Sequence, residues 1–398
     1  MNRMIYLLSI VLLFSSCKAS GNSSTVNIHA VSDPICGDEQ LEMYLPLLTG
    51  KRVAIVANHT AQLNGTHLVD SLLKRSVNVV KVFAPEHGFR GVVPAGEKVE
   101  SGKDERTGVT IVSLYGQHEA PDANDLADVD VVLFDIQDVG TRFYTYLSTM
   151  KYVMESCNLF KKPMIILDRP NPNGHYVDGP VLNMKFKSMV GAIPVPVVHG
   201  CTLGELSKMI IGEEWIKGPI HSELFTVIPC KNYNHQMHYS LEIPPSPNLS
   251  SDCAIQLYPS LCFFEGTMVS VGRGTASPFT CFGYPQFKGG NYAFTPISIA
   301  GKVTHPLYEN KECKGQDLRE QCNQRMSELN LDYLFVVYQQ KGKEMFNSPS
   351  FFDKLAGTDQ LRLSILAGKS KEEIKQSWKL ELDAYRLIRK KYLLYPEE

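Results

Sequence analysis

Short apolar runs that each end in a polar motif constrain the fold of this chain more than any other feature. Four such pairs follow one another: 79–83 with 85–91, 129–134 with 135–144, 164–167 with 168–174, and 195–198 with 199–202. An apolar run of this length before a turn is typical of a buried parallel strand. Because open α/β sheets bind ligands at the carboxyl ends of their strands, we expect the four motifs to meet at one edge and form a site. The alternative is a set of polar loops without a ligand.

Strand-like and helix-like segments alternate from about residue 27 to residue 238. The strand-like residues 52–57, for example, are followed by the helix-like residues 71–74. This alternation builds βαβ units and predicts an α/β fold, with a Rossmann-like parallel sheet and helices on both faces. No Gly-x-Gly-x-x-Gly motif follows any of these strands. The sequence therefore does not imply a dinucleotide, and we expect no cofactor.

The length of the chain predicts a second domain. Its 398 residues minus a leader of 17 leave 381, whereas one domain usually spans roughly 100–200 residues. Turn-rich residues 243–248 mark a crossing between domains. We therefore expect a catalytic Rossmann-like domain at 27–238 and a smaller auxiliary α+β domain at 239–398.

Elements of the second domain are also indicated by the sequence. Strands are predicted at 293–299 and 334–338, before a long terminal helix for which Ser370 and Glu373 form a capping box. The apolar residues of this helix share one face, which indicates packing against a core; they are Ile374, Trp378, Leu382, Tyr385 and Ile388.

The first 17 residues resemble the signal peptide of a bacterial lipoprotein. Arg3 precedes an apolar run from residue 5 to residue 14, and small residues precede Cys17. A membrane-spanning helix would need roughly 20 apolar residues, so this reading is less favoured. We expect a signal peptide at 1–17, lipidation of Cys17 and a polar tether at 18–26. The protein would then be anchored in the cell envelope and face the periplasm, in the inner or the outer membrane.

Charge and cysteine content exclude some partners. The chain has 40 Lys and Arg against 42 Asp and Glu, with no basic block, so nucleic acid is not an expected partner. Nine of its ten cysteines follow Cys17, none of them in a Cys-x-x-Cys pair. A spacing of nine recurs between Cys253 and Cys262 and between Cys313 and Cys322, but it does not assign bridges. Most of the cysteines are interpreted as small buried hydrophobic residues.

Glu86 and His87 are the first candidates for chemistry. They follow an apolar run, where a carboxyl group that is partly shielded from water can hold its proton and act as a general acid. Pro85 stiffens the turn, and Gly88 lets a ligand approach the backbone. The alternative for Glu86 is an ion pair with Arg90.

A second group of candidates comes from the motif at 135–144. Asp135, Gln137, Asp138, Arg142 and Tyr144 would bring carboxylate and amide groups close to an aromatic ring. Such a set suits a sugar, because paired donors and acceptors bind hydroxyls while the ring packs on the apolar face. The alternative is that the two aspartates only cap a helix.

Asp168, Arg169 and Asn171 form the third group, in a turn stiffened by two prolines. A rigid turn without a ligand is the competing interpretation. Glu205, by contrast, follows Thr202 at capping-box spacing and is expected to be structural.

Two glycine-containing motifs of the second domain add Glu265 and Arg273. If a cleft lies between the domains, these two side chains would face Glu86 across it. They would provide a carboxylate and a cation, each next to glycines that make the backbone flexible.

Other enzyme classes lack their residues in this chain. No Gly-x-Ser-x-Gly motif is present, and Ser71 with Lys74 lacks the companion motifs of penicillin-interacting serine enzymes. His235 and His238 lie three residues apart without further ligands at metal spacing, so no metal site is expected.

Together these motifs resemble the exo-β-N-acetylmuramidases, a family long known only as a domain of unknown function. The resemblance covers nearly the whole chain after the leader and includes 85–91, 135–146, 168–172, 264–275 and 392–395. It implies a Rossmann-like catalytic domain and a smaller auxiliary domain, with the active site between them. It also implies release of N-acetylmuramic acid from the non-reducing ends of peptidoglycan fragments. Glu86 corresponds to the implied catalytic acid, and His87, Glu265 and Asp168 are further catalytic candidates.

The implied chemistry agrees with the residues. Glycosidic cleavage commonly uses two carboxyl groups, and their separation decides between retention and inversion; the acetamido group of the substrate is a third possible nucleophile. Muramic acid carries a lactyl carboxylate, which a guanidinium could bind at two points. The candidates are Arg90, Arg142, Arg169 and Arg273.

Two alternatives from other classes stay open. The first is an envelope lipoprotein that binds a muropeptide or glycan without cleaving it. The second is an esterase or amidase of the cell wall, for which no nucleophile and base pair is visible. The sequence does not indicate an oligomeric state.

Overall fold

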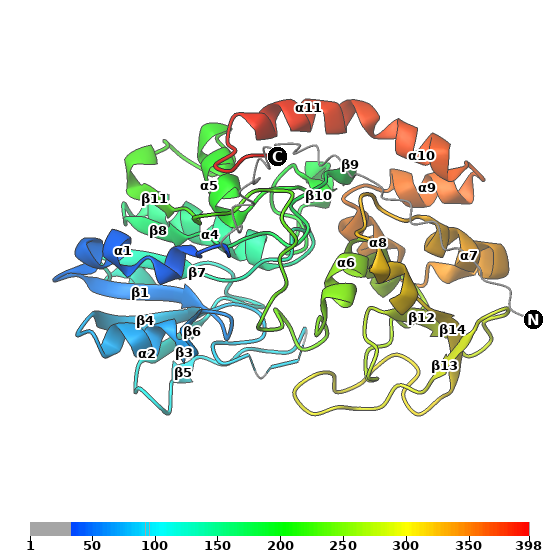
Figure 1. Ribbon diagram of the computed structural model, residues 1–398, viewed down its shortest axis with the longest axis horizontal. Coiled ribbons are helices and arrows are strands. Elements are labelled where there is room, and N and C mark those ends of the chain that lie inside the picture. The colour runs from blue at the N-terminus through cyan, green and yellow to red at the C-terminus, as the bar shows by residue number, and fades with distance from the viewer. Residues whose placement is uncertain (1–32, 92, 95, 398) are drawn as a thin grey trace, which may run out of the picture. The chain divides into compact units, whose positions relative to one another are not determined.

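The apolar runs of the sequence form a seven-stranded sheet in the computed structural model, which describes residues 33–91, 93–94 and 96–397 (Figure 1). The predicted signal peptide (1–17), Cys17, the tether (18–26) and the predicted domain start at residue 27 lie outside these residues. Strand order is β11-β8-β7-β1-β4-β6-β5, with every neighbouring pair parallel except β5 and β6. The strands are β1 (Arg52–Ala57), β4 (Asn78–Ala84), β5 (Gly102–Lys103), β6 (Thr110–Ser113), β7 (Val131–Asp135), β8 (Met164–Leu167) and β11 (Phe225–Ile228).

The strand order confirms the predicted Rossmann-like fold. Along the chain the sheet grows from β1 through β4 to β6, and then from β7 on the other side of β1 through β8 to β11. The direction of growth therefore reverses between β1 and β7, which is the position where doubly wound sheets usually bind a ligand.

Helices cover both faces of this sheet, as the alternation of side chains along β1 shows. Val53 and Ile55 belong to one core with residues of α1 and α2, whereas Ala54 and Val56 belong to a second core with residues of α4 and α5. Successive strand residues point to opposite faces, so a strand buried on both sides reads as a continuous apolar run. The helices are α1 (Leu41–Leu48), α2 (Leu68–Leu73), α3 (Ala123–Leu126), α4 (Tyr146–Leu159) and α5 (Leu203–Gly212).

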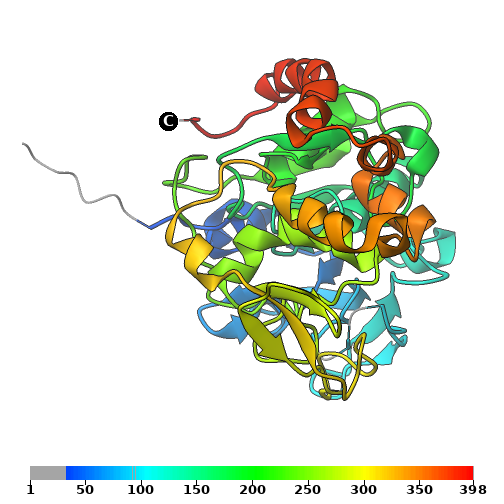
Figure 2. The same cartoon turned by 90° about the vertical axis from the view of Figure 1, so that its right-hand side faces the viewer.

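The rest of the chain combines helices with a small antiparallel sheet in the order β12-β14-β13 (Figure 2). This arrangement agrees with the expected smaller α+β region. The strands are β12 (Cys281–Tyr284), β13 (Tyr292–Phe294) and β14 (Cys313–Asp317). The helices are α6 (Asp252–Leu261), α7 (Asp332–Lys341), α8 (Pro349–Ala356), α9 (Gln360–Leu366), α10 (Lys371–Ser377) and α11 (Lys379–Lys390).

Two short antiparallel pairs complete the strands: β2 (Gln62–Leu63) with β3 (Thr66–His67), and β9 (Asp178–Val181) with β10 (Pro196–Val198). The run at 195–198 therefore forms a strand, but it does not belong to the parallel sheet. Only three of the four predicted polar motifs follow strands of that sheet.

Two strand predictions for the second region were wrong in part or in full. Residues 334–338 lie in α7, where Leu334 and Val337 are buried one helical turn apart. A short apolar run does not distinguish a buried strand from a buried helix, and packing decides. The strand predicted at 293–299 is limited to β13, and the terminal helix is divided into α10 and α11 at Trp378. The capping box of Ser370 and Glu373 is confirmed.

The predicted division at residue 238 stays a prediction. Residues 33–398 form one unit, and a single core contains Val139 and Leu147 together with Phe263 and Phe264. Among the described helices, none combines the length and apolarity needed to cross a lipid bilayer.

A disulfide joins Cys253 in α6 to Cys322. The sequence left this pairing open, and the bridge takes one cysteine from each of the two nine-residue spacings. The other seven described cysteines are free and buried, which confirms their interpretation as small hydrophobic residues.

Candidate active site

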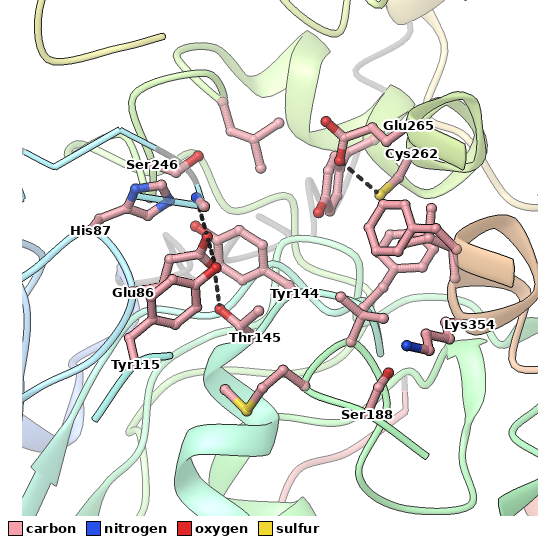
Figure 3. Close-up of a pocket in the computed structure, with 18 of the residues that line it drawn as sticks. Glu86, His87, Tyr115, Tyr144, Thr145, Ser188, Ser246, Cys262, Glu265 and Lys354 are labelled. Atoms are coloured by element: carbon pink, nitrogen blue, oxygen red, sulfur yellow. Dashed lines mark hydrogen bonds between the residues drawn. The ribbon is translucent and has the colours of Figure 1, made fainter. Parts of the chain in front are cut away.

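A cavity of about 860 Å³ has walls that come from distant parts of the chain (Figure 3). One wall contains the turn after β4, Tyr115 after β6, and the start of α4. The other contains residues around Glu265 and the end of α8. A large cavity with a few converging polar groups is the usual form of a small-molecule site.

Glu86 has a hydrogen-bond partner on each carboxyl oxygen. Its Oε1 accepts from the backbone N–H of Gly96 and from the hydroxyl of Tyr115, both at 2.9 Å, and its Oε2 lies 2.7 Å from Oγ1 of Thr145. Burial and the neighbouring Glu86 raise the pKa of Tyr115, so its phenol stays a donor. The Thr145 hydroxyl can donate a hydrogen bond to Oε2 of the carboxylate, or accept one from Oε2 when the carboxyl group is protonated. The same contacts therefore fit both the acid and the carboxylate.

The predicted alternative of an ion pair between Glu86 and Arg90 is wrong. Arg90 instead pairs with Asp70 at 3.1 Å and with Asp104 at 2.8 Å. Both partners come from segments without a recognisable motif, and Arg90 does not line the large cavity.

His87 lines the same cavity and is neutral in its buried environment. Its Nδ1 lies 2.9 Å from the carbonyl oxygen of Val93, which can only accept, so Nδ1 carries the hydrogen. Burial lowers the pKa of His87 below its ordinary value. The neutral ring therefore has Nε2 as an acceptor.

Glu265 and Arg273 also line the cavity, and Figure 3 shows Glu265 on the wall opposite Glu86. Arg273 Nε donates to Glu265 Oε1 at 2.6 Å. Burial raises the pKa of the Cys262 thiol, which stays protonated and contacts Glu265 Oε2 at 3.7 Å. The structure thus brings two carboxyl groups from residues 179 positions apart in the sequence (265 minus 86) to one cavity.

Tyr144 lines the cavity, and its hydroxyl is already used in a hydrogen bond. The hydroxyl donates to the carbonyl oxygen of Pro245 at 2.8 Å, and the ring contacts Tyr146 and Tyr258 edge to face. An aromatic face fixed in this way suits the apolar side of a sugar, as predicted from the motif.

Arg142 does not line the cavity. It is fully buried, and its guanidinium donates to the carbonyl oxygens of Pro180, Val195 and Leu355 at 2.8–2.9 Å. Burial lowers its pKa to about 9. The prediction that it contacts a ligand is wrong, because both terminal nitrogens donate to backbone carbonyl oxygens and the side chain does not reach the cavity.

Asp168 is also enclosed and lies outside the cavity. It accepts from Thr202 Oγ1 at 2.6 Å, from the N–H of Gly204 at 2.7 Å and from Tyr395 at 2.5 Å. Burial raises its pKa to about 6. These contacts fix the start of α5, where Thr202 and Glu205 form the predicted capping box.

Arg169 and Gln137 line a second cavity of about 650 Å³. Arg169 pairs with Asp135 at 2.5 Å and with Asp38 at 2.9 Å. Burial raises the pKa of Asp38 to about 7. Cys36, Asp38 and Glu39 each offer one ligand atom within 4.8 Å of the others, but Arg169 and the Cys36 N–H already use the two carboxylates.

Asp138 and Asn171 have structural contacts. Asp138 accepts from the N–H of Gly140 at 2.7 Å, and Asn171 donates to the carbonyl oxygen of Cys201 at 2.8 Å. Gly140 has φ 79° and lies so close to Asn171 that an added Cβ would be 2.1 Å from Oδ1. The helix-cap alternative for Asp135 and Asp138 is also wrong, because α4 begins only after Thr145.

The structure adds residues that the sequence reasoning missed. Tyr115 follows β6, another apolar run before a turn, and the same rule could have identified it. Thr145 directly follows the predicted Tyr144. Lys187, Ser188 and Lys354 carry no comparable signal, because their segments reach the cavity only through tertiary packing.

Comparison with known proteins shows the family to which this chain is related. The model of the exo-β-N-acetylmuramidase NamZ N-terminal region matches residues 53–252, and that of the C-terminal region matches residues 256–395. Over 385 residues the chain is 34% identical to the peptidoglycan β-N-acetylmuramidase NamZ of Bacillus subtilis (strain 168), with 90% of each chain covered.

Two solved structures of DUF1343 family proteins from Bacteroides fragilis have the same fold. One is 47% identical, with a TM-score of 0.81 over 92% of this chain and 100% of that one. The other is 26% identical, with a TM-score of 0.80 over 91% of this chain and 99% of that one. The two family models together span most of the sequence, so the chain belongs to the NamZ family of exo-β-N-acetylmuramidases.

Proposed function

We propose that this protein is an exo-acting glycoside hydrolase that releases N-acetylmuramic acid from the non-reducing ends of peptidoglycan fragments. The observation that carries the proposal is the carboxyl group of Glu86, held by three partners in a cavity that also contains Glu265. Family membership supplies the substrate class, since the curated relative is a peptidoglycan β-N-acetylmuramidase.

Glu86 is the general acid of the proposed reaction. Its proton passes from Oε2 to the glycosidic oxygen while the bond to the anomeric carbon breaks. The Gly96 N–H, Tyr115 and Thr145 already surround both oxygens, so the carboxylate that forms keeps its partners. Little reorganisation is then needed during the step.

Glu265 is the second carboxyl group, on the wall opposite Glu86. Its ion pair with Arg273 fixes one oxygen, and the other contacts the Cys262 thiol. From this wall it can act on a water, on the anomeric carbon or on the acetamido group of the sugar, and the anomer of the released product distinguishes the first two. In the predicted division at residue 238, the two carboxyl groups belong to different domains.

A disaccharide with a terminal N-acetylmuramic acid tests the proposal. The wild-type protein should release the free sugar, and Glu86→Gln should abolish the release without changing the fold. Glu105→Gln is the matched control, because Glu105 is exposed and does not line the cavity. An active Glu86→Gln protein would show that Glu86 is not the general acid. Saturable binding with an intact disaccharide would instead identify a binding protein.

We also propose that the protein is a periplasm-facing lipoprotein. The support is the leader at 1–17, the lipidation signal at Cys17 and the polar tether at 18–26. Wild-type protein should fractionate with membranes and carry a diacylglycerol on Cys17, and Cys17→Ala should abolish both. A wild-type protein found only in the soluble fraction would contradict this.

A further inference from the structure

The cavity lacks the free guanidinium that a carboxylate ligand was expected to meet. Arg90, Arg142 and Arg169 do not line the cavity, and Arg273 is bonded to Glu265. Muramic acid nevertheless carries a lactyl carboxylate, and burying an anion without a cation or donors is unfavourable. Another group of residues must therefore bind it.

Lysines supply the remaining positive charge of the cavity. Three of them line it: Lys187, Lys302 and Lys354. Among the described residues, no carboxylate forms an ion pair with any of the three. Lys187 Nζ lies over the ring of Tyr152, 5.6 Å from its centroid. Figure 3 shows the ammonium group of Lys354 turned into the cavity, on the same wall as Ser188.

The position of Ser188 indicates which of the three lysines form the subsite. Its Oγ is buried and has no hydrogen-bond partner among the described residues. A buried hydroxyl in this state is unfavourable, and a hydrogen bond to it would be stabilising. Ser188 and Lys354 lie on the same wall in Figure 3, so an unpartnered hydroxyl and a cation share one end of the cavity. Lys187, which directly precedes Ser188, also lines the cavity.

Arg142 holds this end of the cavity together. Its guanidinium donates to Pro180 and Val195, on both sides of the segment that carries Ser188, and to Leu355, which directly follows Lys354. A second link joins the N–H of Asn183 to the carbonyl oxygen of Gly357 at 2.8 Å. The buried Arg142 side chain and this backbone link together fix the two segments that carry Ser188 and Lys354.

We propose that Lys354 and Ser188, with Lys187 beside them, form the subsite for the lactyl carboxylate of the substrate, and that Arg142 is its positioning residue. The inference rests on the proposed function and goes beyond it by naming what distinguishes muramic acid. N-acetylglucosamine has no lactyl group, so this subsite selects between the two sugars by charge.

Two 4-nitrophenyl glycosides, of N-acetylmuramic acid and of N-acetylglucosamine, test the subsite. Lys354→Met should raise KM for the muramic glycoside about tenfold with little change in kcat, because one charge-assisted contact is lost. The glucosamine glycoside should be unaffected. Lys185→Gln is the control, since Lys185 is exposed close to Lys187 but does not line the cavity. An unchanged KM, or equal losses on both glycosides, would overturn the assignment.

A muramic glycoside with its lactyl carboxyl converted to a methylamide provides a second arm. Wild type should lose the same factor on this compound, and Lys354→Met should show no further loss. If wild type cleaves none of the glycosides, the proposed function fails. Calorimetry with free N-acetylmuramic acid then still tests the subsite, which requires weaker binding by Lys354→Met than by wild type.

The role of Arg142 needs a measurement that separates positioning from folding. Arg142→Lys should keep cleavage of the glucosamine glycoside while KM for the muramic glycoside rises. Equal effects on both glycosides would show that Arg142 stabilises the fold and does not position the subsite. Should this variant not fold, Ser188→Ala replaces it, with a selective rise in KM expected and an unchanged KM contradicting the subsite.

Discussion

Thr145 Oγ1 lies 2.7 Å from Glu86 Oε2, a contact that joins the start of α4 to the end of β4. Strand order explains it: β4 and β7 lie on either side of β1, so the segments that follow them meet at the carboxyl edge of the sheet. The carboxyl oxygen that carries the proton of the proposed acid is therefore held by a residue 59 positions further along the chain.

Thr145→Val removes this hydroxyl and keeps the shape of the side chain. Oε2 then loses its partner, and we expect kcat to fall roughly 10- to 100-fold, a part of what general acid catalysis usually contributes. KM should change little. Steady-state rates on the muramic glycoside measure the effect, and Thr145→Ser should restore most of it. Wild-type rates for the valine variant would show that the contact is not used.

His67 should make stability depend on pH. Burial lowers its pKa from 6.5 to about 4, and this effect outweighs the contact of Nε2 with the carbonyl oxygen of Asn58, which raises the pKa. The neutral ring also accepts the N–H of Val69 at Nδ1. The unfolded chain binds the proton first as pH falls, so the stabilisation is complete above pH 6.5 and is lost toward pH 4. The loss is on the order of 3 kcal/mol.

Urea denaturation at several pH values between 4 and 7 measures this dependence. His67→Asn keeps a capping side chain at the start of α2 and removes the titration. The variant should therefore have a flatter profile than wild type over this range. Parallel profiles for the two proteins would assign the effect to other groups.

The disulfide between Cys253 and Cys322 should stabilise the folded state measurably. It closes a loop with a sequence separation of 69 residues, which corresponds to about 4 kcal/mol in the chain-entropy estimate. Reductant should lower the denaturation midpoint of wild type to that of the double variant Cys253→Ser, Cys322→Ser. The double variant itself should not respond, and a wild type insensitive to full reduction would contradict the estimate.

Gly140→Ala should be more damaging than an ordinary glycine replacement. The new Cβ would meet Asn171 Oδ1 at 2.1 Å, in a backbone with φ 79°. Gly65→Ala is the matched control, because Gly65 has φ 71° but nothing within 4 Å of an added Cβ. We expect about 1 kcal/mol of destabilisation for the control and at least about 3 kcal/mol for Gly140→Ala. Similar values for both would show that Asn171 moves aside.

The strands of the parallel sheet could be predicted because their residues are apolar on both faces. The predicted segments 52–57 and 164–167 match β1 and β8 in full. The sequence also predicted Glu86, His87, Tyr144, Glu265 and Arg273 as site residues, and all five line the cavity. Their catalytic and binding roles stay predictions.

The arginines show why the other site residues could not be predicted. The side chain of a residue near a strand end can point to the cavity or to a buried partner. Which direction it takes depends on whether such a partner lies within reach. Arg90 pairs with Asp70 and Asp104, and Arg142 is held by three carbonyl groups. Neither environment is visible in a local pattern, because the partners arise from tertiary packing.

The parallel pairing of β4 with β6 has a consequence for how this site tolerates change. Ala84 is aligned with Ser113, so Glu86 and Tyr115 each stand two residues beyond a matched pair. Removing one residue from β6 would turn the phenol to the opposite side of the sheet, although no residue of the cavity had been substituted. Chain length between the sheet and the cavity is therefore as restricted as the identity of the side chains, and an engineered insertion is safest in the segments far from this edge.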